Sequence, residues 1–426
     1  MADMRDKSGR PVVVVTGMGV VSSLGAGKAD NWAKLTAGQS GIRAIKRFAT
    51  EGLKTTFAGL VDFIPAEPFS AAQLADKVGT LATEEAIAQA AIGSKGDFPG
   101  PLFLGAAPIE VEWPQRETVA RSIGTNSEID YAAMLRASGG GQFAAYHHRF
   151  RFGSIADSLS ETFGTKGAPV SIQTACASGV SAIQLGAEAI RRGECDAALC
   201  VAVDTSVNVE TLVRFSLLSA LSTQNDTPHQ ASKPFSRNRD GFVMAEGAGA
   251  LVLESYESAT ARGAKILGVV AGCGEVSDSF HRTRSNPDGK PIIGCLNNAL
   301  LDAGMEPGQI DYINAHGTST PENDKMESLG ISNVFGNRAS QIPVSSNKSM
   351  IGHTLSAAGA IEAVFSLLTL EHQRIPPTIN YDLPDPAILL DVVPNVARDA
   401  KVTAVMSNSF GFGGQNVSIV MTREPA

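Results

Sequence analysis

Two hydrophobic patterns alternate along the 426 residues. Short runs rich in Val, Ile and Ala predict buried strands, and longer runs with apolar residues three and four positions apart predict amphipathic helices. This alternation favours a mostly parallel sheet covered by helices. Strands are expected in two sets of five: 11–16, 101–105, 169–174, 197–204 and 249–255, then 266–274, 311–315, 342–346, 403–409 and 416–422. Helices are expected at about 81–92, 178–192, 206–218, 289–304, 320–333 and 355–372.

Two segments look like counterparts of each other. Each has a strand, then a reactive side chain, then a helix that begins with small residues, "TACASG" in one case and "HTLSAAGA" in the other. This weak repeat predicts two similar halves in one compact unit. We place them at residues 1–260, with a candidate cysteine, and 261–426, with two candidate histidines.

Composition and charge exclude several classes of protein. A formal charge of −8 and no long Lys/Arg run argue against nucleic-acid binding. Five scattered cysteines without a CxxC pair indicate neither a disulfide framework nor a metal site, and they fit a reduced, cytoplasmic setting. Because no uncharged apolar run reaches spanning length, we expect no membrane insertion.

A glycine-containing segment, "TGMGVVSSLG", follows the first expected strand. It contains GxG, but Ser22 replaces the third glycine of a dinucleotide fingerprint, and no acidic residue closes a second strand about 20 positions on. The glycines are therefore interpreted as a tight turn between strand and helix.

Cys176 lies in "TACASG", where a strand pattern gives way to a helix pattern. The positive end of a helix dipole lowers the pKa of a thiol, so Cys176 is expected to be a thiolate if it is the nucleophile. Free cysteines are also common as small buried core residues. The local pattern leaves both interpretations open.

Two histidines have unusual surroundings. His316 directly follows a strand in "NAHGTSTPENDKME", and His353 directly precedes a helix in "NKSMIGHTLSAAGA". A helix N-terminus discourages protonation, so His353 is expected to be a neutral hydrogen-bond donor. Each histidine alone also fits a buried polar core position. With Cys176 they form a plausible nucleophile and polarising pair.

The glycine-rich segment "SNSFGFGGQN" (407–416) lies between two expected strands. Its backbone N–H groups are suited to an oxyanion hole, although an ordinary hairpin turn has the same pattern. Phe410 and Phe412 are unusual in such a turn and are suited to the wall of an acyl channel.

These segments, taken in order, resemble the elongating β-ketoacyl-[acyl-carrier-protein] synthases of the thiolase-fold superfamily. The resemblance rests on "VVVVTGMGVVSSLG", "TACASG", "ALSTQNDTPHQASKPF", "RDGFVMAEGAGALVLE", "HGTSTPENDKME", "NKSMIGHTLSAAGAIE" and "NSFGFGG", over nearly the whole chain. It implies an α/β fold in which two βαβαβαββ halves form a five-layer αβαβα sandwich. It also implies a homodimer.

The resemblance assigns the central chemistry to three residues. Cys176 would carry the growing acyl chain as a thioester, and His316 and His353 would complete a Cys-His-His site. Lys348 would lie beside the histidines, with Glu362 as its ionic partner.

Four further roles follow from the same motifs. Thr318 and Thr320 match residues that hydrogen-bond the phosphopantetheine arm. The backbone amides of Cys176 and Phe412 match the oxyanion hole, and Phe412 also matches a gate for entering acyl chains, supported by Phe410.

The function implied is decarboxylative Claisen condensation in fatty acid elongation. The acyl group on the cysteine joins malonyl-acyl carrier protein to give 3-ketoacyl-acyl carrier protein and CO2, so acyl carrier protein is the expected partner and no separate cofactor is expected. A discrete polyketide-type ketosynthase and a chain-length-factor-like subunit remain alternatives. A cysteine hydrolase lacks its local signature here, and thiolase needs a second cysteine beyond Cys295.

Two features do not transfer from the family. The segment 104–141 lacks the usual glycine-rich run, so the preferred chain length stays open. An acidic carrier requires a local basic patch on this acidic protein. Candidates for that patch are Arg191, Arg192, Arg214, Lys233 and Arg237.

Overall fold

A computed structural model describes residues 4–67, 70–94, 96–123 and 131–425. Twelve strands of this part of the chain form one mixed sheet, in which β2 (Gly25–Ala26) pairs only with β1. The other strands, in sheet order, are β13 (Asp391–Val392), β11 (Pro343–Ser345), β10 (Tyr312–Asn314), β15 (Ala404–Phe410), β16 (Gln415–Thr422), β9 (Gly268–Ser277), β1 (Val13–Ser22), β8 (Gly247–Ser255), β7 (Ala197–Asp204), β5 (Leu102–Ala106) and β6 (Val170–Ile172).

The strand order repeats across the middle of the sheet. Apart from β2 and β13, each side of the sheet has five strands. Numbered by their order along the chain, the five lie in the order third, second, fourth, fifth, first from the edge to the middle: β6-β5-β7-β8-β1 and β11-β10-β15-β16-β9. The outer three strands of each side are parallel and the remaining pairings are antiparallel, including β1 with β9 at the centre. The prediction of a mostly parallel sheet is therefore wrong, and the division after residue 260 remains a prediction.

Helices and strands stack in five layers. At the centre, α7 (Ser178–Arg191) and α13 (Ala358–His372) pack against each other and against strands of both sides. Outside, α2 (Ala71–Ala90) and α6 (Ser154–Phe163) cover one side, and α10 (Lys290–Ala303) covers the other with α11 (Pro321–Phe335). This confirms the expected αβαβα sandwich. Every α13 residue from Ala358 to Leu370 is buried, because a central-layer helix meets protein all round.

The strand β1 runs straight through the glycine-containing segment. Cβ atoms at Gly17 and Gly19 would overlap the carbonyl oxygens of Ala86 and Ala82 on α2. The interpretation of these glycines as a turn is therefore wrong, because they allow a helix to approach a strand closely.

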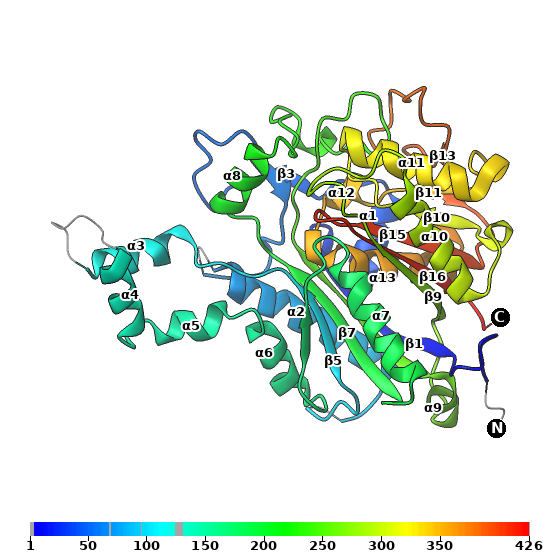
Figure 1. Cartoon of the computed structure of the whole chain (residues 1–426), viewed down its shortest axis with the longest axis horizontal. Helices are drawn as coiled ribbons and strands as arrows, with labels where there is room; N and C mark the ends of the chain where they lie inside the picture. Colours follow the sequence, from blue (N-terminus) through cyan, green and yellow to red (C-terminus); the bar gives the residue numbers. More distant parts are fainter. Residues whose placement is uncertain (1–3, 68–69, 95, 124–130, 426) are drawn as a thin grey trace.

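The segment after β5 departs from the compact body. It carries α3 (Trp113–Arg121), α4 (Tyr131–Gly139) and α5 (Ala144–Phe150), which extend away from the sheet (Figure 1). We call residues 107–153 the arm. No described side chain of these three helices is buried. Residues 124–130 of the atypical segment 104–141 lie outside the described residues.

The remaining elements are short. No helix of the described residues combines the length and apolar character needed to cross a membrane. The short helices are α1 (Lys28–Thr36), α8 (Val209–Leu217), α9 (Tyr256–Ala261) and α12 (Lys348–Ile351). The short strands form two pairs, β3 (Ile42–Ala44) with β4 (Phe57–Gly59) and β12 (Arg374–Ile375) with β14 (Arg398–Asp399).

Candidate active site

Cys176 lies at a sharp turn between β6 and the central helix α7. Ala175, just before it, has a left-handed backbone with φ of 49°. Ser178 fixes the turn, since its hydroxyl donates to the Ala175 carbonyl at 2.7 Å and accepts from the Thr174 N–H at 2.9 Å. The turn presents the thiol to a pocket that Cys176 helps to line.

The structure brings both histidines to this thiol. His316 follows β10, and His353 lies between α12 and the short helix η4 (Leu355–Ala357). The Nε2 atom of His353 is 3.1 Å from the Cys176 sulfur. The two imidazole rings meet edge to face with centroids 5.2 Å apart, and both side chains are buried. Three residues far apart in sequence thus form one cluster.

Burial controls the protonation of the thiol. It raises the pKa of Cys176 to about 11, against opposing contributions from the Phe412 backbone N–H and the Lys348 cation. The prediction of a thiolate stabilised by a helix start is therefore wrong for the resting protein. Cys176 precedes the first residue of α7, Ser178, by two positions, and burial outweighs the dipole there.

Burial also keeps both imidazoles neutral. It lowers the pKa of His316 and of His353 well below the usual value, and the nearby Lys348 cation lowers both further. The expectation of neutral rings agrees with this direction, but its physical reason was incomplete. His353 does not lie at the start of α13, because the helix η4 separates them. Burial is the largest cause of the lowered pKa of His353, and the Lys348 cation is the second.

Lys348 and Glu362 form a buried ion pair near the histidines. Both side chains are about 1% exposed. Burial raises the pKa of Glu362 to about 7, although the Lys348 cation opposes this shift. The two residues therefore have the neighbouring positions that the sequence motifs predicted.

Two buried acids behind His316 were missed by the sequence analysis. Glu327 accepts hydrogen bonds from the backbone N–H of His316 at 2.8 Å and of Gly317 at 2.7 Å, and burial raises its pKa to about 7. Asp324 accepts from the N–H of Phe235 at 2.7 Å. The spacing of three in "ENDKME" places both acids on one face of α11, and this was the available signal.

The glycine-rich segment forms a hairpin loop that also lines the pocket. Residues 411–414 connect the antiparallel strands β15 and β16. Phe412 packs near Cys176 and lines the same pocket, and its backbone N–H opposes the rise in the pKa of the thiol. The Phe410 ring meets the His316 ring at 5.7 Å between centroids. The interpretation as a hairpin turn is therefore confirmed, and the interpretation as an oxyanion hole stays a prediction.

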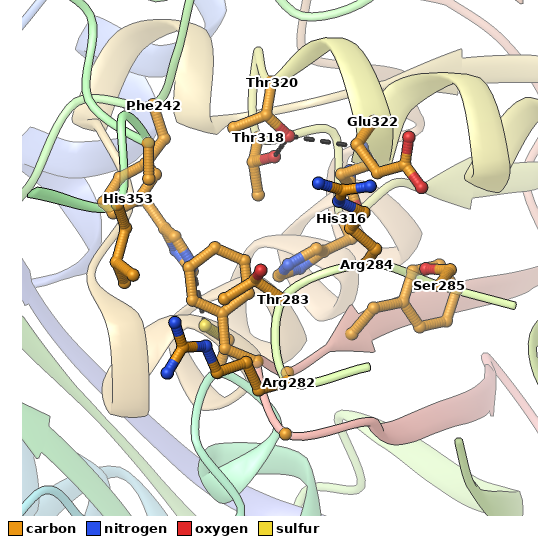
Figure 2. Close-up of a pocket in the computed structure, with 18 of the residues that line it drawn as sticks. Phe242, Arg282, Thr283, Arg284, Ser285, His316, Thr318, Thr320, Glu322 and His353 are labelled. Carbon is orange, nitrogen blue, oxygen red and sulfur yellow. Dashed lines mark hydrogen bonds between the residues drawn. The ribbon is translucent and has the colours of Figure 1, made fainter. Parts of the chain in front are cut away.

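A cavity of about 420 Å³ opens above the three reactive side chains. His316 and His353 point toward one another in it, with Thr318 and Thr320 on one side and Arg282 on another (Figure 2). The threonine hydroxyls are 2.9 Å apart. Aromatic side chains that the sequence analysis did not single out, Phe215 and Phe242, also line this cavity.

The candidate basic patch differs from the predicted one. Arg191 is buried and pairs with Asp302 and Glu188, so the prediction that it belongs to a surface patch is wrong. None of the other four candidates lines the cavity. The exposed cations that do line it are Arg282, Arg284 and Lys325, and none of them forms an ion pair with another described residue.

Comparisons with known proteins narrow the class of protein to which this chain can belong. The model of the beta-ketoacyl synthase N-terminal domain matches residues 10–78 and 105–259, and that of the C-terminal domain matches residues 267–382. The 3-oxoacyl-[acyl-carrier-protein] synthase 2 of Coxiella burnetii is 38% identical, over 96% of this chain and 98% of that protein. The tetracenomycin polyketide synthase ketoacyl synthase alpha subunit of Streptomyces glaucescens is 36% identical, over 96% and 97%.

Solved structures of ketosynthases also match this chain over nearly its whole length. A type II polyketide ketosynthase, in complex with its acyl-carrier protein and bound to the hexaketide, matches with a TM-score of 0.87 and 34% identity, covering 97% of this chain and 100% of that one. A beta-ketoacyl synthase from Burkholderia phymatum matches with a TM-score of 0.83 and 32% identity, with the same coverage. The layered fold and the buried Cys-His-His cluster define a thiolase-fold acyltransferase. Within that class, the chain belongs to the β-ketoacyl synthase family.

Proposed function

We propose that this protein is an elongating β-ketoacyl-acyl carrier protein synthase. It condenses an acyl group held on Cys176 with malonyl-acyl carrier protein, and it releases CO2 and a 3-ketoacyl carrier two carbons longer. One observation carries this proposal: the Cys176 sulfur contacts the His353 Nε2 in a cavity that His316 and Phe412 also line.

The first half-reaction moves the acyl group onto the enzyme. The Cys176 sulfur attacks the acyl-carrier thioester while its proton passes toward the neutral His353 ring, 3.1 Å away. The backbone N–H groups of Cys176 and Phe412 stabilise the tetrahedral oxyanion, at roughly 3 kcal/mol per donor. The proton then leaves with the departing pantetheine sulfur, so the site returns to a neutral state.

The second half-reaction forms the carbon–carbon bond. Once Cys176 is acylated, the His353 ring no longer faces a thiol and donates a hydrogen bond, together with His316, to the malonyl thioester carbonyl. These bonds stabilise the enolate as CO2 departs. The carbanion attacks the acyl carbon, and the displaced Cys176 sulfur takes a proton from solvent.

Neutral imidazoles are essential to this sequence of steps. A protonated ring beside the carbanion would donate its proton and give acetyl-carrier instead of product. Burial and the Lys348 cation lower the pKa of both rings, which supports their role as neutral donors.

Acyl carrier protein is the partner that fits the cavity. Thr318 and Thr320 lie on the wall where a phosphopantetheine arm would enter, and their hydroxyls supply hydrogen bonds to its amides. The substrates arrive on this arm, so we propose no separate cofactor. Arg282, Arg284 and Lys325 line the cavity as exposed cations without an ion pair to any described residue, which suits an acidic carrier.

Charge reversal tests this docking assignment. The double variant Arg282→Glu/Arg284→Glu is expected to raise the KM for acyl-carrier about tenfold or more with little change in kcat, because rim charges act mainly on association. Arg192→Glu, an exposed arginine that does not line the cavity, is the matched control and should leave KM unchanged. A KM effect from Arg192→Glu alone would place the docking surface elsewhere.

Assembly and location follow from the same proposal. We propose a homodimer, supported by the open edge of β6 at one end of the sheet. We also propose a cytoplasmic location, because all five cysteines are free thiols, as a reducing compartment favours.

A polyketide-type ketosynthase is the second candidate, since both kinds of relative match over nearly the whole chain. A chain-length-factor-like subunit is disfavoured by the intact Cys-His-His cluster. The substrate decides between fatty acyl and polyketide elongation. A panel of saturated acyl-carriers and β-ketoacyl-carriers therefore separates the first two candidates.

The deciding experiment reads the covalent intermediate. Purified protein is incubated with the carrier panel, and intact mass locates the acyl adduct on Cys176; malonyl-carrier is then added. We expect the adduct to disappear and a 3-ketoacyl-carrier to form, and Cys176→Ala to give neither. Release of free acid without malonyl-carrier would instead show a hydrolase and overturn the proposal.

A further inference from the structure

The three reactive side chains also form a ligand set for a transition metal. We propose that the unacylated protein captures one Zn²⁺ ion on the Cys176 sulfur and the imidazole nitrogens of His316 and His353. One thiolate and two imidazoles are ligands that zinc takes in proteins. Among the described residues, this cluster alone brings three potential ligand atoms together in a metal-like arrangement.

The distances suit a tetrahedral ion. Zn–S and Zn–N bonds of about 2.3 and 2.1 Å place neighbouring ligand atoms about 3.5 Å apart. The three potential ligand atoms here lie within 4.8 Å of one another, and the Cys176 sulfur is already 3.1 Å from the His353 Nε2. Small side-chain shifts therefore complete three of the four positions. The fourth faces the 420 Å³ cavity, where water is available.

The surroundings favour capture of an ion over permanent residence. Resident zinc sites orient each histidine with a hydrogen bond to its other ring nitrogen. The Nδ1 atom of His353 has no such partner among the described residues. The loss of one such partner weakens metal binding by about 10- to 100-fold. The Lys348 cation opposes a second positive charge, although its ion pair with Glu362 offsets much of that repulsion.

Binding displaces one proton. The Cys176 thiol gives its proton to solvent, the sulfur binds Zn²⁺ as thiolate, and both histidines bind as neutral imidazoles, so no other group changes its charge. A thioester sulfur is a poor ligand, so acylated Cys176 should not hold the ion. If the proposed condensation is right, Zn²⁺ therefore competes with the acyl-carrier for free Cys176 and reversibly inhibits acylation.

Cobalt gives a readout that needs no enzymatic activity. Metal-free protein is titrated with Co²⁺ and should bind one equivalent. The bound Co²⁺ should give an absorption spectrum typical of tetrahedral coordination, with a thiolate charge-transfer band, and Zn²⁺ should then remove this band. Alkylation of native protein with iodoacetamide, confirmed on Cys176 by peptide mass, should abolish the band. His316→Ala should weaken Co²⁺ binding about tenfold or more. Cys195→Ser, which removes a partly exposed thiol away from the cavity, should bind like the unaltered protein.

Two results would overturn the metal site: no charge-transfer band in excess Co²⁺, or a band that survives alkylation of Cys176. A second assay follows acylation of Cys176 by intact mass, with Zn²⁺ and then with a chelator. We expect inhibition that the chelator reverses. A cobalt band without any acylation would count against the proposed condensation and leave the metal site standing, so the two proposals fail separately.

Discussion

At the scale of single residues, the protonation state of Cys176 depends on two opposing effects, burial and a nearby helix start. A thiol two residues before α7 feels the helix dipole, but the surrounding protein removes the water that would solvate a thiolate. Burial raises the pKa to about 11, so burial dominates. The resting protein therefore holds a thiol that gives up its proton during attack.

This assignment predicts the pH dependence of alkylation. The thiolate is the reacting form, and its fraction rises about tenfold per pH unit below the pKa. We therefore expect the rate of iodoacetamide modification of Cys176 to rise by about that factor per unit from pH 7 to pH 9, without a plateau. Peptide mass spectrometry measures the rate, with the partly exposed Cys195 as internal control. A plateau below pH 8 would indicate a preformed thiolate–imidazolium pair with His353.

The buried ion pair makes a second prediction at this scale. Lys348→Met leaves Glu362 buried without a cation, which should lower the free energy of unfolding by about 3–5 kcal/mol. In this variant the folded-state pKa of Glu362 rises further above its unfolded value. The folded protein then holds a proton that the unfolded chain releases, so stability falls as pH rises toward that pKa.

Urea denaturation at pH 5.5 and pH 8 measures this effect. The deficit of Lys348→Met should be larger at pH 8, and Lys348→Met/Glu362→Leu should recover much of it because no charge remains buried. Equal stability of the single and double variants at pH 8 would argue against an unpaired Glu362 carboxylate as the cause.

At the scale of elements, close contact between β1 and α2 predicts a steric cost. A Cβ at Gly19 would overlap a backbone oxygen on α2, which cannot move aside as a side chain can. Gly19→Ala should therefore lower the free energy of unfolding by about 3 kcal/mol. The control Gly139→Ala, in the exposed helix α4 with open space around it, should change stability by no more than about 1 kcal/mol. Urea denaturation compares the two, and a small effect at Gly19 would show that α2 can shift outward.

The sequence predicted most elements because their hydrophobic period was clear. The strand 197–204 agrees with β7 residue for residue, and the helix 178–192 differs from α7 only at its last residue. The prediction failed where one pattern had two physical causes. Glycines in β1 resemble turn glycines. The first half of α2 was missed because its buried face is mostly alanine, with only Leu74 and Val78 as large apolar residues.

The candidate site was predictable by motif, and its electrostatics were not. Cys176, His316 and His353 stand out by the small residues and loop positions around them. A sequence does not show how deeply a group is buried, so the expected thiolate was wrong and the acids Glu327 and Asp324 were missed. Long-range pairing was hidden in the same way, as with Arg191, which the sequence left on the surface but which pairs with Asp302.

At the scale of the whole molecule, the site exists because two similar sides of the sheet meet. Cys176 follows β6 on one side, whereas His316 and His353 follow β10 and β11 on the other. The helices α7 and α13 pack together in the central layer and hold these turns close. Arg191 on α7 ties the sides further through Asp302 on α10. A change in the packing of this layer therefore alters the distance between nucleophile and imidazoles.

The edge of the sheet supplies the last prediction, because strand β6 ends it without a partner on one side. Val170 on this strand is 38% exposed, and open apolar edges pair readily with another chain. The exposed Trp113, at the start of α3 in the arm, adds further apolar surface. If two copies join edge to edge, a charge at Val170 lies near its symmetry mate and repels it. Val170→Lys should shift the protein from dimer to monomer in light scattering after size exclusion, whereas Leu301→Lys on α10 should stay dimeric. A dimeric Val170→Lys variant would require a different interface.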